Sequence, residues 1–138
     1  MKINPKAISI GAVFFLILFL LIRFISSYRF PFFELVEFIG DFFAIFLAGA
    51  ITAYFARCHE ILNGAVCGFI GSILVGLAQY VWELLGLPGD AVGFIGSLFM
   101  AVLCSPIVIF ISGFGAACMQ NFKSKVQPVN TADRLRSG

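Results

Sequence analysis

The chain of 138 residues is 61% hydrophobic and only 12% charged, whereas a soluble domain is about 45–50% apolar and about 25% charged. A soluble domain of this size still needs a polar surface, so the composition excludes that class and indicates an integral membrane protein. The net charge of +2 comes without a basic patch interleaved with aromatic residues, which gives no support to nucleic-acid binding.

Four apolar segments follow one another, each long enough to cross the hydrocarbon core of a bilayer. The first follows two lysines, as in a signal peptide, but its apolar stretch exceeds the usual length of about 7–15 residues. We therefore expect an uncleaved first helix. The predicted spans are about residues 8–25, 38–56, 61–82 and 91–119, and residues 120–138 form a polar cytoplasmic tail.

Small residues recur at every fourth position of the second, third and fourth spans. Such rows let the backbones of neighbouring membrane helices approach closely, as in a glycine zipper. We therefore predict an all-α, integral membrane four-helix bundle with glycine-zipper-like packing in helices two to four. The first span is rich in Phe and Leu, and we expect it outside the core that the other three make. The predicted packing positions are Gly40, Ala44, Ala48, Gly64, Gly68, Ser72, Gly76, Gly93, Ser97 and Ala101.

Two uses of these rows remain open at this stage. They can hold a single chain together, or one row can serve a second copy or another membrane subunit. The fourth span adds a separate feature, because its length of roughly 43 Å exceeds the bilayer core of about 30 Å. Pro106 predicts a helix bend there, and Ser105 is placed to satisfy a backbone carbonyl that the proline leaves without a donor.

The charges predict an orientation. Four spans place both termini on one side of the membrane, and seven basic residues fall on that side against two on the other. Because basic residues accumulate in cytoplasmic loops, we expect both termini in the cytoplasm of a bacterial or archaeal cell, in a multi-pass protein of its cell membrane. The seven are Lys2, Lys6, Arg57, Lys123, Lys125, Arg134 and Arg136, and the two are Arg23 and Arg29.

Few residues are candidates for chemistry. Asp41 is the only acid placed within a span, and we predict an interfacial ion pair with Arg23, the alternative being an ion or proton site. His59 lies in a polar turn without metal-ligand spacing around it. We expect no catalytic residues, no metal and no cofactor, and thus no enzyme, because no set of polar groups converges in the sequence.

Two segments carry a resemblance to known proteins: residues 47–54, Leu-Ala-Gly-Ala-Ile-Thr-Ala-Tyr, and residues 63–71, Asn-Gly-Ala-Val-Cys-Gly-Phe-Ile-Gly. Over residues 40–76 the chain resembles uncharacterised small glycine-rich four-helix membrane proteins of bacteria and archaea. In those proteins a small-residue helix ends in a basic turn and a Gly-Ala-x-x-Gly helix follows. The resemblance implies the fold and no activity.

We expect a non-enzymatic protein, either a packing or scaffold subunit of a membrane assembly or a homo-oligomer. Its partners would be the lipid bilayer together with copies of itself or other membrane subunits. The alternative is a small channel or carrier whose path runs along the small-residue helices. Such a path needs polar groups in mid-membrane, for which the candidates are Ser72, Ser97 and Ser105. Burial of these serines against neighbouring helices, without a cavity, would exclude it.

Overall fold

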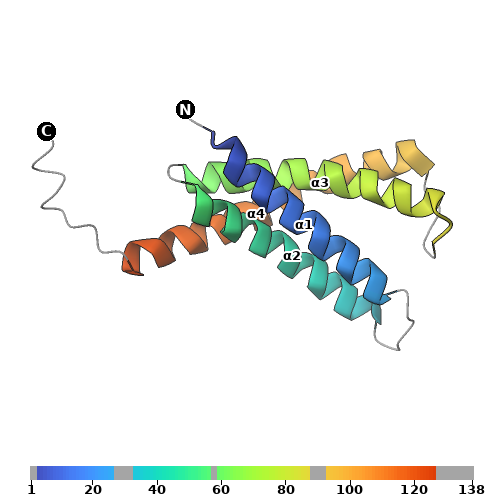
Figure 1. Cartoon of the computed structure of the whole chain (residues 1–138), viewed down its shortest axis with the longest axis horizontal. Helices are drawn as coiled ribbons and strands as arrows, with labels where there is room; N and C mark the ends of the chain where they lie inside the picture. Colours follow the sequence, from blue (N-terminus) through green and yellow to red (C-terminus); the bar gives the residue numbers. More distant parts are fainter. Residues whose placement is uncertain (1–2, 27–32, 57–58, 88–92, 127–138) are drawn as a thin grey trace, which may run out of the picture.

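The computed structural model describes residues 3–26, 33–56, 59–87 and 93–126 (Figure 1). These residues form an all-helical bundle, and each of its four helices is long and apolar enough to cross a membrane. The helices are α1 (Pro5–Ser26), α2 (Phe33–Phe55), α3 (Glu60–Leu84) and α4 (Gly93–Val126).

The bundle consists of two helix pairs that form a V. In Figure 1, α1 lies beside α2 and α3 lies beside α4; the pairs are together at the end where α1 begins, and they diverge toward the other end. The two middle helices, α2 and α3, each contact both α1 and α4. We call the end where α1 begins and α4 ends the closed half, and the opposite end the hollow half.

Backbone contacts hold the closed half together. A Cβ atom added to Gly49 of α2 would overlap the carbonyl oxygen of Ser112, and one added to Gly115 of α4 would overlap the carbonyl oxygen of Phe46. The α3 row also faces α4, since a Cβ at Gly68 would lie 2.8 Å from Cβ of Ser112. These helices therefore approach as closely as small residues allow.

Hydrogen bonds reinforce the same half. The Ser112 hydroxyl donates to the Gly64 carbonyl oxygen across the α3–α4 interface, at 2.7 Å. Asn63 is fully buried; its side-chain oxygen accepts from the Asn4 backbone N–H at 2.9 Å, and its amide donates to the His59 carbonyl at 3.0 Å. The start of α1 is thereby tied to the first turn of α3.

The helix α1 takes a larger part in the core than its composition indicated. It lies against α2 and α3, and Ala12, Phe15 and Phe19 are buried. A Cβ at Gly11 would overlap the Thr52 hydroxyl of α2. The expectation that the first helix stays outside the core is therefore wrong for this face, because a single glycine allows the approach that a full row provides elsewhere.

The helix α4 passes Pro106 without interruption. The Ser105 hydroxyl donates to the Val102 carbonyl at 2.8 Å, and this is the carbonyl whose helical N–H donor the proline removes. The predicted role of Ser105 is confirmed, while the bend at Pro106 stays a prediction.

The same helix continues past the predicted span end at residue 119. Lys123, in its last turns, donates from Nζ to the carbonyl oxygens of Ala53 at 2.5 Å and Ala56 at 3.1 Å. A cation beside the carbonyls at the C-terminus of α2 is a favourable partner for the helix dipole, and this contact holds the end of α4 against the end of α2. Residues 127–138 of the predicted tail lie outside the described residues.

Candidate functional site

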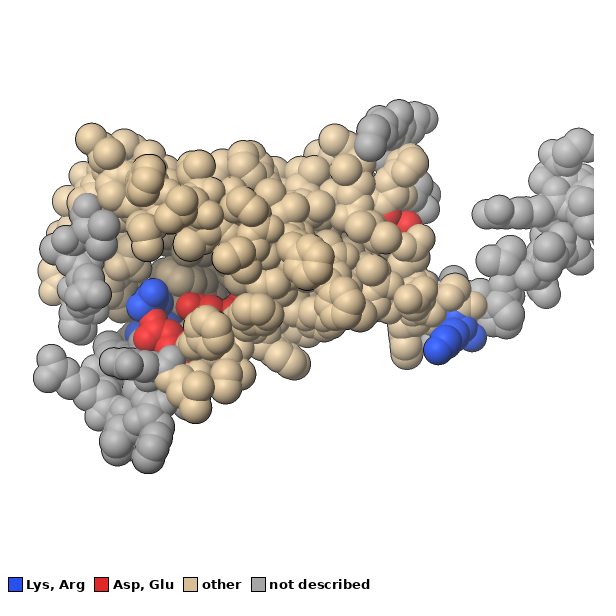
Figure 2. Space-filling model, turned by 180° about the vertical axis from the view of Figure 1, so that it is seen from behind, with Lys and Arg blue, Asp and Glu red and all other residues tan. Residues whose placement is uncertain are grey.

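A cavity of about 390 Å³ opens between the helices of the hollow half. Figure 2 shows a hollow in the surface, with basic and acidic side chains gathered at its mouth. All four helices contribute to its walls. The lining residues are Phe15, Phe19 and Arg23 of α1; Asp41 and Ile45 of α2; Ser72, Val75, Gly76 and Gln79 of α3; and Ser97, Met100, Ala101, Cys104 and Val108 of α4.

The cavity follows from where the close helix contacts lie. The α3–α4 contact persists into the hollow half, since a Cβ at Gly76 would lie 2.8 Å from Cβ of Ala101. The α2–α4 backbone contacts, at Gly49 and Gly115, belong to the closed half. Beyond them the two helix pairs diverge (Figure 1), and the cavity lies between the pairs.

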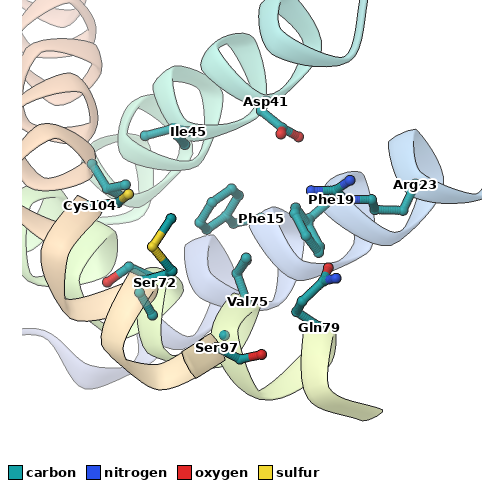
Figure 3. A pocket seen from close by; sticks show the side chains of 14 residues that line it. Phe15, Phe19, Arg23, Asp41, Ile45, Ser72, Val75, Gln79, Ser97 and Cys104 are labelled. Carbon is teal, nitrogen blue, oxygen red and sulfur yellow. The ribbon is translucent and has the colours of Figure 1, made fainter. Parts of the chain in front are cut away.

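Charged side chains lie at the mouth of the cavity. Arg23 forms a salt bridge with Glu37, and its guanidinium lies 5.3 Å from the centre of the Phe19 ring. Asp41 lies one turn further along α2, and in Figure 3 its side chain and that of Arg23 point toward one another. Oδ1 of Asp41 is buried and has no hydrogen-bond partner among the described residues.

The structure thus places both members of the predicted Arg23–Asp41 pair on one cavity, and Arg23 also forms a salt bridge with Glu37. Glu37 begins α2's apolar stretch and Asp41 follows at helical spacing, so one face of the helix carries both acids. In the sequence, Asp41 stands out because it lies within the predicted span of residues 38–56, whereas Glu37 precedes that span.

The three mid-span serines differ in their surroundings. Ser72 and Ser105 donate to carbonyls of their own helices, those of Phe69 and Val102, each at 2.8 Å. Ser97 is only 5% exposed, and its hydroxyl has no partner among the described residues. Ser97 therefore contributes an unused polar atom to the cavity wall, and the other two hydroxyls are already satisfied.

The predicted packing positions fall into four groups. Ala44, Ala48, Gly64 and Gly68 are buried in helix contacts, and Ser72, Gly76, Ser97 and Ala101 are buried beside the cavity. Gly40 is half-buried, with Ile22 beside it. Gly93 is exposed, and a Cβ there would meet nothing within 4 Å. Its φ of +69° at the start of α4 accounts for the glycine.

Other candidates lie away from the cavity. His59 is exposed at the start of α3, and the described residues hold no group of three His, Cys, Asp or Glu side chains that could bind a metal ion. Cys58, Arg29 and Arg57 lie outside the described residues. Cys104 lines the cavity, and Cys67 is buried in the closed half.

The aromatic wall of the cavity had no clear signal in the sequence. Phe15 and Phe19 look like the other phenylalanines of an apolar span, yet both are buried on the cavity. The Phe15 ring occupies the notch at Gly71, where a Cβ would overlap it. In the sequence, Gln79 could have indicated this wall, because it is a polar residue in an apolar span.

A second hollow, of about 620 Å³, differs in character. It lies along the outer faces of α2 and α4, and its walls are phenylalanine and isoleucine side chains. It has no charged group to orient a ligand, so the cavity between the pairs is the stronger candidate site. The walls of this outer groove are Phe38, Ile39, Phe42, Phe43, Phe46, Ile107, Phe110, Ile111 and Phe114.

No protein-family model, curated protein or solved structure matches this chain.

Proposed function

We propose that this chain is a multi-pass protein of a bacterial or archaeal cytoplasmic membrane that binds a small solute in the cavity of its hollow half and acts as a carrier. Its role is non-enzymatic. Its termini lie in the cytoplasm, so the cavity opens to the outer side, and the small-residue rows of α2, α3 and α4 pack as a glycine zipper. The positive-inside distribution of the charges supports this orientation.

One observation carries the proposal. Asp41 and Ser97 line the same cavity from two different helices, and each has a buried side-chain oxygen without a hydrogen-bond partner in the described part of the chain. An unpaired polar group in an apolar surrounding costs about 1–3 kcal/mol by protein mutational data, and an unpaired charge costs more. A subunit that only packs against others gains nothing from such a pair, whereas a binding site needs groups of this kind.

The closed half supports a carrier over a channel. The close contacts at Gly49, Gly115 and Gly68 leave no room for side-chain carbon, still less for a solute. A pore needs a continuous path, whereas a carrier holds one side closed while the other is open. The V of two helix pairs supplies two bodies that can rock against each other about these contacts.

The small-residue rows also bear on the scaffold alternative. A scaffold or homo-oligomer needs a row that faces outward, toward a second protein. The α3 row instead faces α4 of the same chain, at Gly64 and Gly68. The α2 row faces α1, since a Cβ at Gly11 would lie 2.9 Å from the Ala48 carbonyl oxygen. This internal use favours the binding function, and the rows serve the monomer.

Thiol accessibility tests the proposal. In a variant whose four native cysteines are replaced by Ser or Ala, Ser97→Cys is exposed to a membrane-impermeant methanethiosulfonate reagent added to intact cells. We expect modification of this cysteine, because it lines a water-accessible cavity open to the outside. Ser112→Cys is the matched control; it lies on the same helix in the closed half, fully buried, and should stay unmodified.

Inside-out vesicles complete the test. A carrier visits a state open to the cytoplasm, so Ser97→Cys should also react there, at a slower rate. Reaction from the outside alone would indicate a binding protein that does not transport. Protection of Ser97→Cys from both sides would refute the solute-binding function.

A further inference from the structure

We propose that the cavity takes a protonated organic amine with an apolar body, and that Asp41 supplies its counter-charge. This inference rests on the proposed solute-binding function and adds the chemical class of the solute. The recognised group is an organic ammonium that carries N–H donors, whether it belongs to a free amine or to the headgroup of a lipid.

The charge balance at the cavity favours a cation. Arg23 and Asp41 are the charged residues that line the cavity, and Arg23 forms a salt bridge with Glu37. Among the described side chains, these three groups, one positive and two negative, have a net charge of −1. Oδ1 of Asp41 is buried without a hydrogen-bond partner among the described residues. A bound cation would supply the missing charge and a donor, and it would offset the cost of burying the carboxylate.

The size and the walls favour an organic cation. Ligand pockets for small molecules measure about 300–1,000 Å³, and this cavity of about 390 Å³ is within that range and far larger than a metal ion. Phe15, Ile45 and Val108 are buried side chains of the wall. Because the Phe15 ring is seated against Gly71, its position is fixed, and an aromatic ring attracts a neighbouring cation.

The hydrogen-bond acceptors of the cavity limit the kind of ammonium group that fits it. Ser97 lies on α4 and Asp41 on α2, and Figure 3 shows the two side chains at separate places around the cavity, with Phe15, Phe19 and Val75 between them. A carboxylate oxygen accepts hydrogen bonds and a hydroxyl oxygen also accepts them. A protonated primary or secondary amine has N–H donors for the Asp41 carboxylate, whereas a quaternary ammonium has none.

Calorimetric titration of the full chain in phosphatidylcholine nanodiscs tests this assignment, with empty nanodiscs subtracted. The probes are 2-phenylethylammonium, its neutral analogue 2-phenylethanol and the anion phenylacetate. We expect binding of the ammonium only. Asp41→Asn, which keeps the side-chain shape, should weaken that binding by about tenfold or more.

Three further variants test how the charges and the Ser97 hydroxyl contribute to binding. Glu83→Gln removes a carboxylate at the same end of the bundle but outside the cavity lining, and it keeps an oxygen for the Gly93 N–H that Glu83 accepts at 2.9 Å; it should leave binding unchanged. Asp41→Glu should retain binding within a few-fold. Ser97→Ala should weaken it less than Asp41→Asn does, because Phe15, Phe19 and Val75 lie between Ser97 and Asp41. Each variant must elute as the parent does in size-exclusion chromatography.

Other binding results would overturn or refine the amine assignment. Equal binding of the alcohol and the ammonium, unaffected by Asp41→Asn, would overturn the amine assignment and leave the cavity function supported if Ser97→Cys is accessible. Absence of binding by all three probes, or tighter binding of the zwitterion phenylalanine, would also overturn it. Displacement of 2-phenylethylammonium by dihexanoyl-phosphatidylethanolamine would support the ammonium chemistry and identify a lipid headgroup as its source.

Discussion

Both halves of the bundle contain small buried residues, but these residues make close helix contacts in the closed half and line a cavity in the hollow half. In the closed half, Gly49 and Gly115 bring the backbones of α2 and α4 into direct contact. In the hollow half, Ser97 and Ala101 are equally small and buried, but they face a cavity on the side of α1 and α2. A small residue permits close approach without requiring it, so the contact depends on what the opposite helix presents.

Polar groups show the same contrast. In the closed half, the buried side chains of Ser112, Asn63 and Thr52 have hydrogen-bond partners within the chain. In the hollow half, Asp41 and Ser97 have buried atoms for which the described residues offer no hydrogen-bond partner. Satisfied polar groups rigidify a structure, and unsatisfied ones are expected where a ligand or water completes the site. This contrast is consistent with the proposed carrier, which needs a rigid closed half and a binding site in the hollow half.

The largest expected effect comes from adding one methyl group to the closed half. Gly49→Ala and Gly115→Ala each direct a Cβ into a backbone carbonyl oxygen of the facing helix, and backbone cannot turn away as a side chain can. We expect the free energy of unfolding to fall by about 1–3 kcal/mol or more. The measurement is reversible unfolding in mixed micelles of increasing dodecyl sulfate fraction.

Gly113→Ala is the matched control for this change, on the same helix two residues from Gly115. Its nearest neighbour would be the Ala65 Cβ at 4.0 Å, an ordinary contact. The substitution should leave stability unchanged or raise it by about 0.5–1 kcal/mol, because alanine favours the helix. Equal stability of all three variants would show that the closed half is not closely packed, and the comparison of halves would fail.

An intermediate effect is expected from Ser112→Ala. This change removes the buried hydrogen bond to the Gly64 carbonyl while leaving the helix contact in place. Hydrogen bonds between membrane helices contribute about 0.6 kcal/mol on average and about 1.7 kcal/mol at most, so the same unfolding assay should show a loss in this range. Ser124→Ala, at an exposed serine that bonds within its own helix, should show none. A loss at Ser124 as large as at Ser112 would contradict the importance of the interhelical bond.

The smallest effect is expected for Gly40→Ala in the hollow half. The added Cβ would meet the Ile22 side chain, whose Cδ1 lies 3.2 Å away. A flexible side-chain end can move aside, and the gain in helix preference compensates, so the change in unfolding free energy should stay within about 0.5 kcal/mol. A loss as large as that of Gly49→Ala would show that the hollow half is packed as tightly as the closed one.

The small-residue rows show which packing positions could be predicted from the sequence and which could not. Spacing at every fourth residue identified Gly64 and Gly68, because neighbours on one helix face follow from helical geometry alone. It also included Gly93, where the glycine serves a left-handed start of α4. It missed Gly11, Gly49 and Gly115, which make some of the closest approaches, because a single contact point leaves no periodic signal.

Only individual residues of the candidate site could be predicted from the sequence. Asp41 and Arg23 stood out because charges are rare in apolar spans, and the serines were named as the polar groups of mid-span. Their joint position on one cavity depends on how far α2 diverges from α4, and no local pattern encodes that distance. The choice of Ser97 over Ser72 and Ser105 as the unpaired hydroxyl depends on local hydrogen bonds that all three could form in principle.

The sequence by itself determined that the chain forms four apolar helices of membrane-spanning length, because length and hydropathy are properties of each segment alone. It also determined which faces carry small residues. Only the tertiary structure decided that these faces meet within one chain, that the helices pair into a V, and that Asp41 and Ser97 share a cavity with a wall of phenylalanines. These features arise from contacts between helices distant in sequence, and the close approach at one end fixes the space left at the other.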